Sequence, residues 1–253
     1  MSVFSLEGKK AVITGGSKGL GKGIAEAFAE NGASTVVVSR SQADCDAVSA
    51  AIREKYGTAS FGIAADLTKS EDIARLTEKA VEALGGIDVL VNNAGSAIAK
   101  NAEDLTEEDW DFVMDLDLKA VFFTAQSFGK LMIEQKSGKI INIASVLGLV
   151  ADRRLLAYCV AKGGVIQMTK AFALEWARYN IQVNSICPAY VITDMNRKSI
   201  ANEEFSKYLL GKTPMGRFGE VEEIAGAAVY LASEAANYMT GQYIVLDGGW
   251  TAV

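Results

Sequence analysis

A tyrosine and a lysine lie four residues apart in Tyr158-Cys-Val-Ala-Lys162, and Ser145 precedes them. On a helix, positions i and i+4 share a face, so the phenol and the ammonium can point into one cleft. The ordinary pKa of a phenol is about 10, and a nearby positive charge lowers it by stabilising the phenolate. Ser145 could then hold a substrate oxygen while Tyr158 gives or takes its proton, which is acid–base catalysis.

These residues also have structural explanations. A tyrosine four residues before a lysine is common on ordinary helices, and a serine after a strand often caps the backbone. The sequence contains no histidine. That absence excludes Ser-His-Asp and Cys-His nucleophilic sites and any metal site with a histidine ligand, and no metal is expected.

A strand, a glycine-rich turn and a helix follow one another in residues 9–31. The glycines Gly15, Gly19 and Gly21 let the backbone approach a ligand, because no Cβ stands in the way. The unpaired N–H groups at the start of the helix attract phosphate. The spacing differs from the standard G-x-G-x-x-G, so an ordinary βα turn explains this segment equally well when it is taken alone.

Strands and helices alternate along the rest of the chain, which predicts right-handed βαβ units and an α/β fold with a parallel sheet. The predicted strands are Ala11–Ile13, Ser34–Ser39, Ser60–Ala64, Ile87–Val91, Gly138–Ile143, Gln182–Ile186 and Tyr243–Leu246; the predicted helices after the first are Asp44–Tyr56, Ser70–Leu84, Glu107–Gln135 with a bend near Asp117, Leu155–Tyr179 and Val221–Ala232. No linker divides the pattern, so residues 1–253 are predicted to form one domain. Residues 187–214 have weak periodicity and both prolines, and we expect a substrate loop or lid there.

The second predicted strand ends at Ser39-Arg40. In dinucleotide-binding folds an acidic residue at this point binds the 2′-hydroxyl of NAD, whereas an arginine accommodates the 2′-phosphate of NADP. Arg40, with Lys18 in the glycine turn, therefore favours NADP(H) over NAD. The alternative is that both are solvated surface cations.

Composition restricts the other functions. The net charge is 25 − 31 = −6 without a run of basic residues, which argues against nucleic-acid binding. No stretch approaches the ~20 apolar residues that cross a bilayer, and the N-terminus does not resemble a signal peptide. The three cysteines are widely spaced and form no disulfide framework, which indicates a reducing cytoplasm.

Five motifs together resemble the short-chain dehydrogenase/reductase family from about Leu6 to Gly249. In order, they are Thr14-Gly15-x-x-x-Gly19-x-Gly21, Asn92-Asn93-Ala94-Gly95, Ser145, Tyr158-x-x-x-Lys162 and Asn184-x-x-x-Pro188. The resemblance implies a single doubly wound Rossmann-type domain, with a seven-stranded parallel sheet between two layers of helices, and usually a homotetramer.

The resemblance also implies roles. Tyr158 would be the proton donor or acceptor, Lys162 would bind the nicotinamide ribose and lower the tyrosine pKa, and Ser145 would orient the carbonyl. The residues expected to bind the cofactor are Gly15, Ser17, Lys18, Gly19, Leu20, Gly21, Ser39, Arg40, Asp66, Leu67, Asn93, Ala94, Gly95, Tyr158, Lys162, Val191 and Thr193.

One departure from the family pattern concerns Asp117, which stands where the family usually has asparagine. In the family, the backbone carbonyl of that asparagine holds a water in a proton relay to the lysine. An aspartate keeps this carbonyl, but its charge could instead lie buried near Lys162 and alter the pH dependence. Asp117 is therefore a further catalytic candidate.

The function implied is an NADP(H)-dependent oxidoreductase for a sugar, polyol, sugar acid or small ketone. Residues 151–158 and 202–205 resemble the gluconate 5-dehydrogenase and sugar/polyol dehydrogenase branch of the family. One alternative is a 3-oxoacyl-carrier-protein reductase, whose acidic partner needs a basic face; Lys130, Lys136 and Arg178 are the candidates. Another is an inactive NADP-sensing regulatory protein, against which the intact catalytic motifs argue.

Overall fold

Seven parallel strands form the central sheet, in the order β3-β2-β1-β4-β5-β6-β7. The computed structural model describes residues 2–193 and 197–252. The strands are β1 Lys10–Thr14, β2 Ser34–Ser39, β3 Ser60–Ala64, β4 Val89–Asn92, β5 Gly138–Ile143, β6 Ile181–Pro188 and β7 Tyr243–Leu246. This order confirms the Rossmann-type parallel sheet predicted from the sequence.

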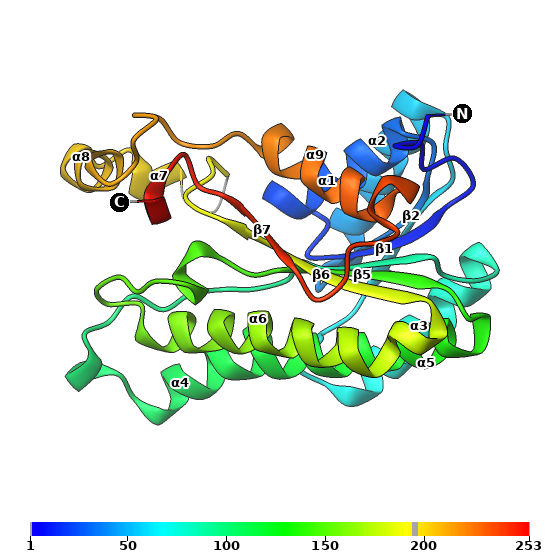
Figure 1. Ribbon diagram of the computed structural model, residues 1–253, viewed down its shortest axis with the longest axis horizontal. Helices are drawn as coiled ribbons and strands as arrows, with labels where there is room; N and C mark the ends of the chain where they lie inside the picture. The colour runs from blue at the N-terminus through cyan, green and yellow to red at the C-terminus, as the bar shows by residue number, and fades with distance from the viewer. Residues whose placement is uncertain (1, 194–196, 253) are drawn as a thin grey trace.

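Helices cover both faces of the sheet (Figure 1). They are α1 Gly19–Glu30, α2 Gln42–Tyr56, α3 Ser70–Leu84, α4 Glu107–Met114, α5 Ala120–Gln135, α6 Leu156–Trp176, α7 Arg197–Ile200, α8 Glu203–Gly211 and α9 Val221–Ala232. In Figure 1, α1, α2 and α9 lie above the sheet and α3, α4, α5 and α6 lie below it. None of the helices in the described part of the chain is long and apolar enough to span a membrane.

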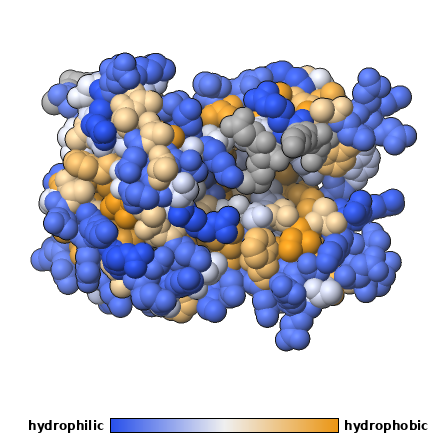
Figure 2. Space-filling view, turned by 180° about the vertical axis from the view of Figure 1, so that it is seen from behind, coloured by the Kyte–Doolittle hydropathy of each residue, from blue (hydrophilic) through white to orange (hydrophobic). Residues whose placement is uncertain are grey.

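Each strand sends alternate side chains to the two helical layers, as the two-residue period of a strand requires. In β1, Ala11 and Ile13 join the core under α1 and α9, while Val12 joins the core under α3 and α5. Because both faces are buried, the strands are almost continuously apolar. Figure 2 shows that the outer surface, seen from behind, is mostly hydrophilic, with smaller hydrophobic areas between.

The order in which successive strands are added to the sheet reverses between β1 and β4. It runs from β1 to β2 and β3 on one side and then crosses to β4 on the other, so β1 and β4 are neighbours. In open α/β sheets a ligand binds beyond the carboxyl ends of the strands at such a switch point. The ends of these two strands, Thr14 and Asn92, therefore mark the expected ligand site.

Two segments differ from the sequence-based expectation. The predicted helix over 107–135 consists of α4, a π-helical turn at Asp115–Lys119 and α5, so the expected bend near Asp117 is a π turn that points this side chain inward. The predicted loop over 187–214 contains α7 and α8. Asn202 caps α8 by accepting the N–H of Phe205 at 2.9 Å.

Candidate active site

The glycine turn after β1 lies directly against the turn after β4. Gly15 and Gly19 have left-handed φ angles of +63° and +54°. A Cβ on Gly21 would lie 2.3 Å from both Asn93 Nδ2 and the carbonyl oxygen of Gly15. Only glycine fits at this contact, so the backbone can form a tight cradle at the start of α1.

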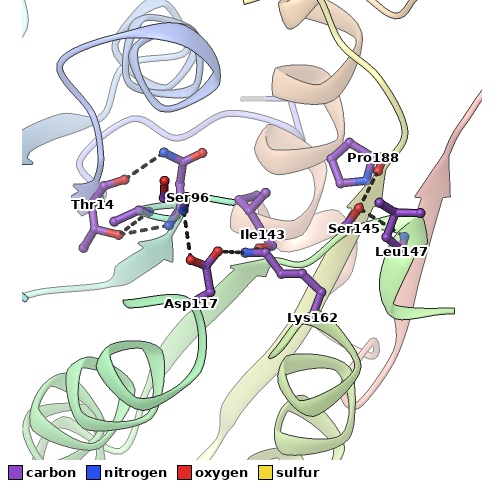
Figure 3. Close-up of polar contacts among 10 residues, drawn as sticks. Thr14, Ser96, Asp117, Ile143, Ser145, Leu147, Lys162 and Pro188 are labelled. Carbon is purple, nitrogen blue, oxygen red and sulfur yellow. Dashed lines mark hydrogen bonds and ion pairs between the residues drawn. The ribbon is translucent and has the colours of Figure 1, made fainter. Parts of the chain in front are cut away.

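Thr14 ties the two turns together, as Figure 3 shows. Its hydroxyl donates to the carbonyl of Val91 at 3.2 Å and accepts the N–H groups of Asn93 at 2.9 Å and Ala94 at 3.1 Å. Asn93 Nδ2 donates to the carbonyl of Thr14 at 2.9 Å. Thr14 is not among the residues predicted to bind the cofactor, although it begins the glycine motif just before Gly15.

The remaining cofactor candidates lie along the same edge of the sheet. Ser17, Lys18 and Leu20 belong to the turn and the first residues of α1. Ser39 ends β2 and Arg40 follows it, Asp66 and Leu67 follow β3, and Val191 and Thr193 follow β6. Arg40 and Lys18 are exposed. A Cβ built on Gly19 would lie 3.4 Å from the Cβ of Thr193, so the segment after β6 reaches the glycine turn.

This arrangement fits a dinucleotide. Lys18, the residue before α1, makes no side-chain cap, and the first N–H groups of a helix attract phosphate. The cradle of Gly15 and Gly21 removes the Cβ atoms that would block close approach. None of the described side chains forms a cluster of histidine, cysteine, aspartate or glutamate suited to a metal.

Ser145 lies two residues after the end of β5 and caps the start of the 3₁₀ turn η3 (Val146–Gly148). Its hydroxyl oxygen accepts the N–H of Leu147 at 3.1 Å and donates to the carbonyl of Pro188 at 3.5 Å (Figure 3). The backbone cap that we considered is therefore present. The hydroxyl of Ser145 also acts to lower the pKa of Tyr158, so the serine belongs to the polar group around the phenol.

Tyr158 and Lys162 lie one turn apart on α6 and face one another. Lys162 Nζ is 5.4 Å from the centre of the Tyr158 ring and donates to the carbonyl of Ile143 at 3.1 Å. The structure thus brings the phenol, the ammonium and Ser145 together beyond the ends of β5 and β6. This is the geometry that acid–base catalysis by the phenol needs.

Asp117 completes the group from the π turn. Its Oδ1 lies 3.2 Å from Lys162 Nζ, and its Oδ2 accepts the N–H of Ser96 at 2.9 Å (Figure 3). The ammonium and Oδ1 form an ion pair but not an aligned hydrogen bond. A Cβ on Gly95 would lie 2.5 Å from Oδ1, so glycine at this position makes room for the carboxylate.

The charges in this group oppose one another. Burial raises the pKa of Tyr158; Lys162 and the hydroxyl of Ser145 lower it, whereas Asp117 raises it further, and the net shift is upward. Burial likewise raises the pKa of Asp117 against the pull of Lys162. Lys162 lowers the pKa of Tyr158 as expected, but burial outweighs the ammonium, so the net shift is upward.

Comparison with known proteins agrees with the site. A family model described as Enoyl-(Acyl carrier protein) reductase matches residues 15–251. The chain is 41% identical to the 2-dehydro-3-deoxy-D-gluconate 5-dehydrogenase of Escherichia coli, over 100% of this chain and 99% of that protein. The chain belongs to the short-chain dehydrogenase/reductase family. This confirms the resemblance found in its motifs.

Two further short-chain dehydrogenases bear on the cofactor. The NAD-dependent glycerol dehydrogenase of Listeria innocua is 40% identical, over 98% of this chain and 96% of that protein. The crystal structure of a gluconate 5-dehydrogenase from Burkholderia cenocepacia, in complex with NADP and tartrate, matches with a TM-score of 0.95 and 36% identity, over 99% of this chain and 98% of that chain. This chain is likewise an NAD(P)-dependent dehydrogenase that acts on CH–OH groups.

Proposed function

We propose that this short-chain dehydrogenase uses NADP(H) to interconvert an alcohol and a carbonyl of a polyol, sugar or sugar acid, with Tyr158 as proton donor or acceptor. The observation that carries the proposal is the contact between Tyr158 and Lys162, whose ammonium is 5.4 Å from the phenol ring. Ser145 adjoins the same phenol. These groups lie at the sheet edge that holds the glycine cradle.

Each side chain has one task. Ser145 Oγ donates to the substrate oxygen and fixes its position beside the phenol. In the oxidative direction the proton of the alcohol passes to the phenolate of Tyr158, and in the reductive direction the phenol returns it. Lys162, held by Ile143 and Asp117, keeps a positive charge beside that oxygen. When bound, the nicotinamide supplies or accepts the hydride.

NADP(H) is the proposed cofactor because the end of β2 presents Arg40 and no acidic residue. Lys18 is the second cation on the same side of the site. The relatives differ, since the Listeria enzyme is NAD-dependent and the Burkholderia structure holds NADP. The proposed preference of this chain for NADP(H) therefore rests on Arg40 and Lys18 and not on the cofactors of its relatives.

The substrate class follows from the relatives that match over the full length. Their names refer to glycerol, gluconate and 2-dehydro-3-deoxy-gluconate, which are polyhydroxylated and in two cases acidic. A panel of sugars, polyols, sugar acids, small ketones and an acetoacetyl thioester, read by NADPH absorbance, tests the proposal. Preference for the thioester would replace it with the 3-oxoacyl-carrier-protein reductase alternative.

A homotetramer is the proposed assembly. Large apolar side chains remain exposed on the helical layer below the sheet, including Phe112 on α4, Phe123 on α5 and Leu174 on α6, the last 85% exposed. Burying such side chains between copies of the chain would stabilise an oligomer. Light scattering after gel filtration measures the mass directly, and a monomer at micromolar concentration would contradict this assembly.

A further inference from the structure

A buried carboxylate joins the loop before the catalytic helix to helix α8. Asp152 Oδ1 accepts the hydroxyl of Tyr208 at 2.6 Å and Nζ of Lys212 at 3.1 Å. Lys212 also donates to the Tyr208 hydroxyl. The aspartate side chain is 7% exposed and lies six residues before Tyr158, so the contact links α8 directly to the start of α6.

Aromatic side chains extend this contact into a ring. Lys212 Nζ lies 5.3 Å from the centre of the Trp250 ring, and Trp250 packs on Tyr190 with ring centres 5.5 Å apart. Tyr190 meets Phe205 of α8 edge to face at 6.2 Å. These contacts therefore hold four separate segments together: the loop before α6, α8, the segment after β6 and the C-terminal turn.

The ring borders the catalytic phenol. Tyr190 lies two residues after Pro188, whose carbonyl accepts the hydroxyl of Ser145 at 3.5 Å, and Asp152 lies six residues before Tyr158. Burial, followed by the charges of Asp152, Tyr158 and Tyr208, raises the pKa of Tyr190 to about 12. Within the ring, burial raises the pKa of Asp152, but hydrogen bonds from Tyr208, the Arg153 backbone and Lys212 outweigh it and lower the pKa. The carboxylate thus stays charged at neutral pH and keeps its two donors.

We propose that Asp152 is a positioning residue for the substrate: it fixes α8 and Tyr190 beside Tyr158 and so shapes the side of the site that receives the alcohol or carbonyl. This role rests on the proposed function. It assigns a task to Asp152, which lies in the segment 151–158 that resembles the sugar/polyol dehydrogenase branch but had no role of its own. The cofactor cradle lies around β1 and β4, so Asp152 should influence substrate binding and leave NADPH binding unchanged.

The test compares Asp152→Ala with Asp152→Asn, which keeps an acceptor of the same shape, and with Asp111→Asn as a control at an exposed carboxylate on α4. Losing a charge-assisted contact should raise the KM for the best panel substrate about tenfold in Asp152→Ala and less in Asp152→Asn. The kcat and the Kd for NADPH should stay within about twofold of wild type. Asp111→Asn should behave as wild type.

Hydrogen exchange read by mass spectrometry checks the cause without any turnover. Amides of α8 should exchange faster in Asp152→Ala, while those of α1 and β1 should not change. An unchanged KM, or unchanged exchange in α8, would overturn the role of Asp152 alone. A general loss of protection and of NADPH affinity would also overturn it, because Asp152 would then support the whole fold. Failure of the wild type on every panel substrate would instead refute the proposed function and with it this role.

Discussion

The carboxylate of Asp117 lies 3.2 Å from the ammonium of Lys162, and both side chains are almost entirely buried. The π turn at Asp115–Lys119 directs the aspartate inward, and the N–H of Ser96 holds its second oxygen. The positive charge beside Tyr158 is thus partly balanced from within the site. An asparagine at this position would leave Lys162 unopposed.

Replacing Asp117 by asparagine should move the pH profile of alcohol oxidation to lower pH. Burial raises the pKa of Tyr158, and the charge of Asp117 adds to the rise. Removing that charge lowers the pKa, so the reactive phenolate forms at a lower pH. The measurement is log kcat/KM against pH with a fixed alcohol. An unmoved profile would show that the carboxylate has no electrostatic effect on the phenol, and a profile moved to higher pH would show an effect of the opposite sign; either would contradict the prediction.

Removing the carboxylate altogether should destabilise the protein. Asp117→Ala leaves the buried ammonium of Lys162 without its partner, and breaking one side of a buried pair costs about 3 kcal/mol or more of unfolding free energy. Asp117→Asn can still accept the Ser96 N–H and should lose less. Urea unfolding of the two variants measures the difference. Midpoints equal to that of the wild type in both variants would contradict the ion pair as a source of stability.

Tyr158→Phe should abolish most of the turnover and leave cofactor binding intact. The variant keeps the ring that faces Lys162 but loses the hydroxyl that carries the proton, and general acid–base groups contribute about 10²–10⁴-fold. Single-turnover rates and NADPH titration measure the two effects separately. Unchanged turnover would remove Tyr158 from the mechanism. Wild type that binds NADPH but never turns over would instead favour the regulatory alternative.

Much of the fold follows from local patterns. The apolar runs that become β1 to β7 are short and bounded by turns, so the seven strands were predictable within a few residues. The helices inside residues 187–214 were not predictable, because α7 has only four residues and α8 is short and mixes apolar with polar side chains. The placement of α8 depends on contacts with Asp152 and Tyr190, which lie outside this helix in the sequence.

The arrangement of two site residues was predictable where both lie on the same helix. Tyr158 and Lys162 share a helix, so their common face follows from the helical period. The pairing of Asp117 with Lys162 depends on the π turn, which the helical period of the sequence does not predict. The upward shift in the pKa of Tyr158 was missed for a similar reason, since burial is set by the surrounding loops and not by the motif itself.

Arg40→Ala should reduce the preference for NADPH over NADH. A side chain that contacts the 2′-phosphate contributes a charged hydrogen bond, so kcat/KM for NADPH should fall about tenfold or more. The same variant assayed with NADH provides the control, because NADH lacks the phosphate and its kcat/KM should hardly change. Lys18→Ala should act in the same direction. A parallel loss with both cofactors would mean that these cations support the fold and do not select the cofactor.

Gly21→Ala should destroy the cofactor cradle, whereas Gly226→Ala should be harmless. The new Cβ at position 21 would lie 2.3 Å from Asn93 Nδ2 and from the Gly15 carbonyl, so one of the two turns must shift. Gly226 is exposed in α9 with nothing within 4 Å of its added Cβ. Alanine there should stabilise the helix by about 0.5–1 kcal/mol. NADPH titration and thermal unfolding of both variants measure these effects. Tight NADPH binding by Gly21→Ala would mean that the glycine turn is an ordinary βα connection and that the dinucleotide lies elsewhere.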